Sequence, residues 1–193
     1  MRLDEIITTS RTTIHEIGGY FIPTPHTTRI EYEFKHTANH QVNTPSGREY
    51  INLPTGKSQF VWHMHPKNMG GYPSFEDLTI ATELKGTRFS SYVNVIVTPD
   101  HTWVLLSPKI YNSKDELDLQ QIYNSEYELN LKRNYDLFYE NCEWWRARKD
   151  KKALKNAYVE FAYFMTTEMG YPIRVVDNTN VSAIMRAIRA MHS

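Results

Sequence analysis

The chain has 193 residues, enough for one sizeable hydrophobic core but a tight fit for two full domains. Its 22 basic residues balance its 22 acidic residues, so no overall charge favours nucleic acid, anionic lipid or acidic substrates. The single cysteine, Cys142, excludes an internal disulfide framework and any multi-cysteine zinc site. A metal ion would therefore need histidine and carboxylate ligands.

The N-terminal third predicts a helix and two strands. Residues 2–12 place Leu3, Ile6 and Ile7 on one side of a short helix, and 14–22 have the composition of a strand broken at Gly18-Gly19. Residues 27–36 alternate between apolar and charged side chains, which is typical of a half-buried strand. The Asn-, Thr-, Pro- and Gly-rich segment 36–57 predicts a long loop or a loose hairpin. The N-terminus has no apolar signal-peptide core and the chain has no run of about 18 apolar residues, so we expect a soluble, cytoplasmic protein without membrane contact.

The middle of the chain predicts alternating strands and helices. Residues 58–65 read as a strand, and 73–86 as a helix with Ser74 at its N-cap and Gly86 just beyond its end. Residues 91–108 contain two apolar runs around the turn 98–101, which predicts a hairpin.

The C-terminal part is charged, aromatic and periodic. We expect two helices between residues 113 and 169, broken near 148–152, then a short strand over 171–177 and an amphipathic docking helix over 180–192. Trp144 and Trp145 precede a basic run, a combination found in nucleic-acid binding segments. Because the whole chain is neutral and acidic residues flank this run, we expect no nucleic-acid partner. The simpler interpretation is a helix with its tryptophans on the core side and its charges in water, and a partner-binding surface is the intermediate one.

Candidate chemistry is concentrated in residues 60–78. In a strand, His63 and His65 project to the same side, and a loop made pliable by Gly70-Gly71 can bring Asp77 beside them. Two imidazoles and one carboxylate leave the fourth tetrahedral position of Zn(II) open for water, as in hydrolytic sites. A general base is also needed, and Glu16 is the candidate, ahead of three other upstream glutamates, Glu31, Glu33 and Glu49.

Each half of this pattern also has a purely structural interpretation. A His-x-His pair on a strand is commonly two ordinary surface or core histidines. Ser74 is an ordinary helix N-cap residue, and Asp77, an acidic residue in the first turn, complements the helix dipole. The case for a metal site depends on finding Glu16, the histidine pair and Ser74-x-x-Asp77 together and in this order.

The segments "HEIGGYFI", "HMHP" and "PSFEDL" together resemble the signature of the JAMM (MPN+) zinc metallopeptidases. The resemblance covers about residues 1–110 and implies the family's α/β, cytidine-deaminase-like fold, a curved mixed sheet flanked by helices. Residues 111–193 would then be a mainly helical extension packed on this core. It further implies Zn(II) on His63, His65 and Asp77, with Glu16 as acid and base and Ser74 stabilising the oxyanion.

The family hydrolyses peptide or isopeptide bonds, commonly those that join ubiquitin or ubiquitin-like proteins to lysine, so the resemblance implies a protein or peptide substrate. Two departures are visible: one extra residue between His65 and Ser74, and no recognisable substrate-binding insertion in 36–57. Two alternatives stay open. One is a catalytically silent MPN-like scaffold whose C-terminal helices bind a protein partner, and the other is a phage or viral assembly-processing peptidase with the same chemistry.

Overall fold

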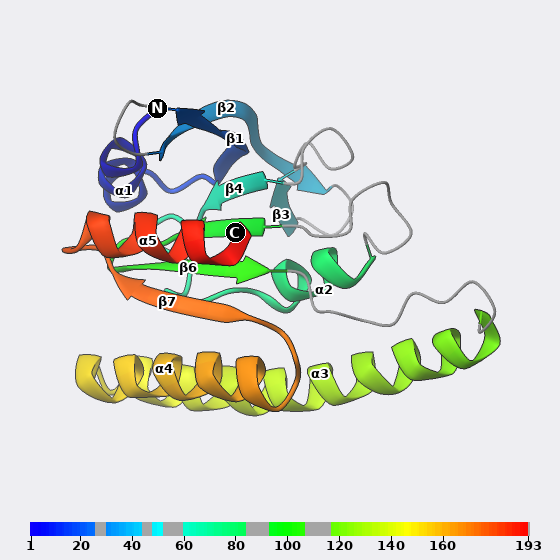
Figure 1. The fold of residues 1–193 in the computed structure, drawn as a ribbon. Coiled ribbons are helices and arrows are strands. Elements are labelled where there is room, and N and C mark those ends of the chain that lie inside the picture. Colours follow the sequence, from blue (N-terminus) through cyan, green and yellow to red (C-terminus); the bar gives the residue numbers. More distant parts are fainter. Residues whose placement is uncertain (26–29, 44–47, 52–59, 84–92, 107–116, 193) are drawn as a thin grey trace.

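A computed structural model describes residues 1–25, 30–43, 48–51, 60–83, 93–106 and 117–192. Within these segments the chain forms a mixed α/β fold, with one open sheet and helices around it (Figure 1). The strands are β1 (Ile17–Pro25), β2 (Ile30–Asn43), β3 (Arg48–Ile51), β4 (Phe60–Met64), β5 (Val93–Val97), β6 (His101–Leu106) and β7 (Ile173–Asp177). The helices are α1 (Leu3–Thr12), α2 (Phe75–Glu83), α3 (Leu117–Ala147), α4 (Lys151–Thr167) and α5 (Val181–His192).

The sheet runs in the order β3-β2-β1-β4-β5-β6-β7. β4 and β5 are parallel, as strands on either side of a helix such as α2 can be, and every other neighbouring pair is antiparallel. The expected α/β class and mixed sheet are therefore confirmed. A register shift in the β1–β2 pairing falls between Gly18 and Gly19, where the sequence predicted a break.

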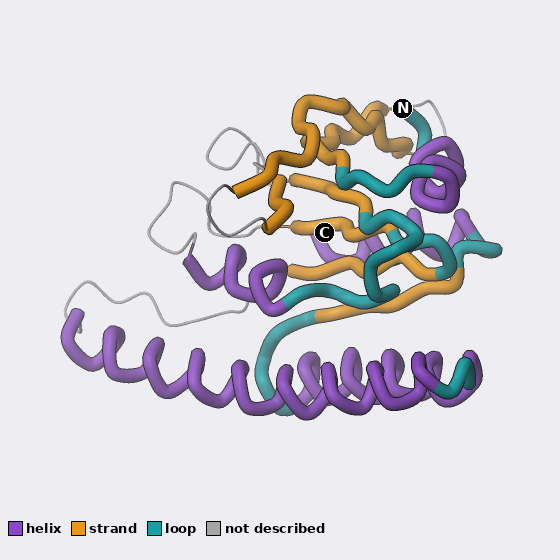
Figure 2. Tube along the Cα trace, turned by 180° about the vertical axis from the view of Figure 1, so that it is seen from behind, coloured by secondary structure: helices purple, strands orange, loops and turns teal. Residues whose placement is uncertain are grey.

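Two apolar clusters cover the two faces of the sheet. One joins alternate residues of β4, β5 and β6 to α3 and α4, and includes Val61, Ile96 and Trp103. The other joins the opposite residues of these strands to α1 and α5, and includes Trp62 and Met64. Figure 1 shows α5 crossing in front of the sheet, and in Figure 2, which views the molecule from behind, α5 lies behind the strands. The central strands are consequently buried on both faces.

α3 and α4 form an antiparallel hairpin, so the predicted helix pair and its break are confirmed. Lys149 lies in the turn at φ 54°, and the Asp150 side chain caps α4 by accepting a hydrogen bond from the N–H of Ala153. The prediction for the tryptophans is wrong for Trp144, which is 55% exposed and stacks under the Arg148 guanidinium, 3.2 Å from the ring centroid. A guanidinium stacked in this way covers one face of the indole, although the tryptophan does not lie in the core.

Segments from the expected extension contribute to the sheet itself. β7 pairs with β6, and α5 lies against β5, β6 and β7 with Ile184 and Ile188 fully buried. The strand and docking helix predicted there are confirmed, while the division of the chain at residue 110 stays a prediction. Within residues 36–57, expected to be a long loop or a loose hairpin, the end of β2 pairs with β3, and residues 44–47 and 52–57 lie outside the described residues. None of the helices in the described segments combines the length and apolar character needed to span a bilayer.

Candidate metal centre

The two histidines lie where β4 ends. His63 is within the strand and His65 directly follows it, with relative exposures of 1% and 2%. The backbone N–H of His65 donates to the carbonyl of Val97 at 2.8 Å, which fixes this residue at the end of β5. Their Nε2 atoms approach to 3.2 Å, so both imidazoles point to one place, as the sequence predicted.

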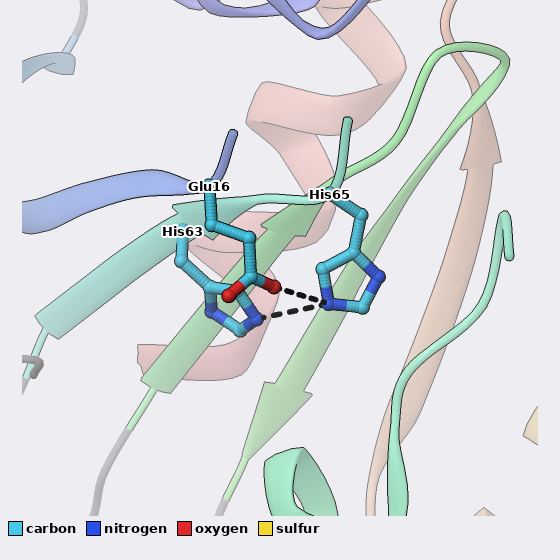
Figure 3. A group of neighbouring side chains, drawn as sticks. All are labelled: Glu16, His63 and His65. Atoms are coloured by element: carbon cyan, nitrogen blue, oxygen red, sulfur yellow. Dashed lines mark hydrogen bonds and ion pairs between the residues drawn. The ribbon is translucent and has the colours of Figure 1, made fainter. Parts of the chain in front are cut away.

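Glu16 reaches the same place because of the pairing between β1 and β4. Ile17 pairs with Met64 and Gly18 with His63, so continuing the antiparallel register by one residue sets Glu16 opposite His65. The Glu16 side chain is buried, and its Oε1 lies 3.7 Å from Nε2 of His65 (Figure 3). Of the competing glutamates, Glu33 instead pairs with Lys35 on β2, and the side chains of Glu31 and Glu49 lie outside the described residues.

The loop between His65 and α2 is held in place rather than pliable. The Trp103 indole N–H donates to the carbonyl of Gly71 at 3.0 Å, and the Tyr135 hydroxyl donates to the carbonyl of Pro73 at 2.9 Å. A side chain at Gly70 would start 2.6 Å from the Tyr72 ring, so this glycine is required for close packing. The extra residue relative to the JAMM spacing is accommodated by a packed loop that still delivers α2 to the histidines.

Ser74 and Asp77 form a reciprocal cap at the start of α2. The Ser74 hydroxyl accepts a hydrogen bond from the N–H of Asp77 at 3.1 Å, and Oδ2 of Asp77 accepts one from the N–H of Ser74 at 2.8 Å. This arrangement fixes the Asp77 carboxylate. Within the described residues, the Ser74 hydroxyl is hydrogen-bonded to Asp77. The role expected for Ser74 at an oxyanion stays a prediction.

The Asp77 carboxylate bridges the two imidazoles. Its Oδ1 lies 3.0 Å from Nε2 of His63, and its Oδ2 lies 3.2 Å from Nε2 of His65. Since Asp77 is itself buried, these three groups form a closed triangle inside the protein, at the end of β4 and the start of α2. A helix dipole adds to this arrangement, because a carboxylate in the first turn is stabilised by the positive end of the helix.

The charges in this triangle shift one another's protonation. Burial disfavours the ionised form of Asp77, but the adjacent imidazoles outweigh it and hold the pKa of this carboxyl well below its usual value. Burial likewise lowers the pKa of His63, yet Asp77 and Glu16 raise it above the usual value on balance. Without a metal ion, the site therefore favours a proton on His63 facing an ionised Asp77.

The donor set fits a metal ion. Glu16, His63 and His65 each offer one ligand atom, all within 4.8 Å of one another, so this buried group could hold a cation. Zinc bound to nitrogen and oxygen at about 2.0 Å in a tetrahedron needs ligand atoms about 3.3 Å apart. The 3.2 Å between the Nε2 atoms of His63 and His65 is close to this value, and the 3.7 Å from His65 to Glu16 is longer. Asp77 approaches the two imidazoles with different oxygens, Oδ1 at 3.0 Å from His63 and Oδ2 at 3.2 Å from His65.

Several buried polar atoms near the two histidines lack a hydrogen bond to the described residues. They are Nδ1 of His63, Nδ1 of His65 and both amide atoms of Asn94 on β5. Buried polar groups in proteins are almost always paired, so each of these atoms calls for an explanation. Asn94 was not among the residues predicted from the sequence, although a carboxamide within the run "VNVIV" of apolar strand residues was an available signal.

Cys142 offers no competing chemistry. It is fully buried in α3, and burial together with Glu143 raises the pKa of its thiol to about 12. A thiol of this kind is not a nucleophile near neutral pH.

In comparisons with known proteins, no family model and no curated protein matches this chain. The resemblance to the JAMM family therefore rests on the short motifs and on the way the fold assembles their residues.

Proposed function

We propose that this protein is a zinc-dependent peptidase or isopeptidase of the JAMM type. The observation that carries the proposal is the meeting of His63, His65 and Asp77, in which each imidazole Nε2 lies 3.0 to 3.2 Å from a carboxylate oxygen and 3.2 Å from the other Nε2. Three such ligands would leave the fourth position of a tetrahedral zinc ion for water. These three residues come from the motif segments that resemble the family. A protein or peptide substrate follows from the reaction, with no nucleic-acid or membrane partner.

A zinc ion bound there would polarise a scissile carbonyl and bring the pKa of bound water to about 7. Glu16, the second carboxylate of the site, is buried beside His65 and outside the tight triangle. We assign it the general base, which takes the proton of the attacking water and passes it to the leaving amine. Ser74 uses an oxygen lone pair for the Asp77 N–H, so its own hydroxyl proton stays available to donate to the oxyanion.

The test is cleavage of the lysine isopeptide bond that joins two ubiquitin molecules in a conjugate. Zinc-loaded wild type should cleave the conjugate, and chelator-treated protein should not. Glu16→Gln should keep its zinc and lose at least about 100-fold in rate, because general base catalysis typically contributes this much or more. Glu33→Gln is the matched control, since Glu33 is paired with Lys35 away from the site. Unchanged cleavage by Glu16→Gln would remove Glu16 from its role.

A second candidate is a non-catalytic scaffold with the same fold. It is favoured by the apolar side chains that α3 and α4 leave in solvent, namely Leu129, Leu137, Tyr139, Trp144, Val159 and Tyr163. Large exposed apolar side chains on neighbouring helices are typical of protein-binding surfaces. Zinc-loaded wild type should be tested on this conjugate and on a phage or viral assembly protein. Cleavage of neither substrate would favour the scaffold over the peptidase.

A further inference from the structure

Asn94 is a polar residue in an apolar strand. It lies in β5, where the other four residues are buried and apolar, and its own relative exposure is 1%. Neither its amide nitrogen nor its carbonyl oxygen has a hydrogen bond of standard geometry with any residue that the structure describes. A carboxamide held like this is a poor choice for packing alone, because leucine fills the same volume without unsatisfied atoms.

The strand register places Asn94 on the same face as His63 and diagonal to it. β4 and β5 are parallel, with Val61 paired to Asn94 and His63 paired to Ile96. Since side chains alternate and Val61 and Ile96 share one apolar cluster, Asn94 and His63 project from the same face of adjacent strands. Burial lowers the pKa of His63, and Asp77, Glu16 and the Asn94 side chain raise it, which agrees with this placement.

The two ring nitrogens of His63 have different surroundings. Nε2 faces His65 and Asp77, at 3.2 and 3.0 Å, and is the atom available to a metal ion. Nδ1 is buried and has no hydrogen bond within the described part of the chain. A neutral histidine that binds metal through Nε2 carries its proton on Nδ1, and this N–H normally donates to an oxygen that fixes the ring.

We propose that Asn94 is the positioning residue of His63, with its Oδ1 accepting the Nδ1–H when Nε2 holds the metal ion. The inference rests on the proposed metal centre and adds a residue that the motifs do not contain. Asn94 thereby selects the tautomer and the ring orientation of one ligand. It does not touch substrate or the reacting atoms.

The experiment compares Asn94→Leu, Asn94→Asp and Asn178→Leu with wild type, by competition for zinc with a chromophoric chelator. Asn178 is the matched control because it is also a buried asparagine, but it is satisfied by Thr102 and by the carbonyl of Thr98, both at 2.6 Å. Asn94→Leu should weaken zinc binding about 10- to 100-fold, the usual effect of losing such a partner. Asn94→Asp keeps an acceptor and should retain wild-type affinity or better. Asn178→Leu should lower the melting temperature of the metal-free protein and leave the zinc affinity of the folded protein unchanged.

A second readout follows the proton itself. In NMR spectra of the zinc-loaded protein labelled with ¹⁵N-histidine, the Nδ1–H of His63 should be protected from exchange in wild type and Asn94→Asp, and lost or rapidly exchanging in Asn94→Leu. Wild-type zinc binding with equal affinity in Asn94→Leu would overturn this inference alone. A wild type that binds no zinc would overturn it together with the proposed metal centre.

Discussion

The two faces of β4 carry opposite chemistry in the same few residues. Trp62 and Met64 project into the cluster formed with α1 and α5, whereas His63 projects toward α2, where His65 and Asp77 meet it. Burial does not distinguish the faces, because all of these side chains are almost completely enclosed. Trp62 and Met64 stabilise the fold by removing apolar surface from water. Val61, on the same face as His63, does so in the other apolar cluster, and this face also encloses polar groups that need a partner.

The fold supports the site through β4. Apolar packing on both faces holds this strand, so His63 is carried by a rigid element rather than by a loop. Stability and metal binding should therefore separate between neighbouring residues of β4. Substitutions of Trp62 and Met64 should unfold the protein, and substitutions of His63 should release the metal.

The largest effect on stability is expected for Trp62→Ala. The indole is fully buried, contacts Phe34 edge to face, and donates its N–H to the carbonyl of Lys35 at 3.1 Å. Truncation should lower the free energy of unfolding by about 3–5 kcal/mol, which denaturant titration would measure. The protein that remains folded should bind as much zinc as wild type. A loss below about 1 kcal/mol would contradict the stabilising role assigned to Trp62.

The next effect is at the metal centre. Asp77→Asn keeps an acceptor for the N–H of Ser74 but removes the charge that faces both imidazoles. Zinc affinity should fall by more than about 100-fold, because losing a ligand costs more than losing a residue that only hydrogen-bonds a ligand. The metal-free variant should also be less stable than wild type near neutral pH, because a carboxyl pKa held below its usual value means that the ionised group stabilises the fold. Zinc affinity equal to that of wild type would show that Asp77 is a cap and not a ligand, leaving Glu16 as the carboxylate of the metal group.

A smaller effect is expected at the helix start. Ser74→Ala removes the acceptor for the N–H of Asp77 and should cost about 1 kcal/mol of stability. Ser74→Thr keeps the cap and serves as the control. If Ser74 also acts on the oxyanion, the alanine variant should lose cleavage rate well beyond this loss of stability, whereas a rate that follows stability would limit Ser74 to capping.

The smallest effect is a pH dependence. In the metal-free protein the pKa of His63 is raised, so its stabilising contribution is present below the usual histidine value of about 6.5 and is lost as the pH rises through the higher folded pKa. Zinc binds the neutral imidazole, so zinc binding is favoured as the pH rises. The zinc-induced rise in melting temperature should therefore be larger at pH 8 than at pH 6. His63→Ala/His65→Ala should show no rise at either pH.

Local patterns predicted much of this fold. Amphipathic spacing located α1, α5 and the two helices of the α3–α4 hairpin, and alternation located the start of β2. The end of β2 and the β3 strand were not recognised as regular strands, because residues 36–51 are polar and lack clear alternation. The core position predicted for Trp144 was wrong, because the helical pattern does not reveal that the Arg148 side chain stacks on an indole at the surface.

The site was predictable as a set of residue types and not as a geometry. The motif segments name Glu16, His63, His65 and Asp77, and the structure brings all four together. The reach of Glu16 depends on the β1–β4 register, which connects residues far apart in the chain. Asn94 depends on the β4–β5 register in the same way, so no local spacing could have linked it to His63.

The most direct test of the metal centre is zinc per chain, measured by elemental analysis on untagged protein after reconstitution. Wild type and Glu16→Gln should each hold about one zinc, and His63→Ala/His65→Ala should hold none. Wild type without zinc, or a double variant that keeps it, would contradict the account.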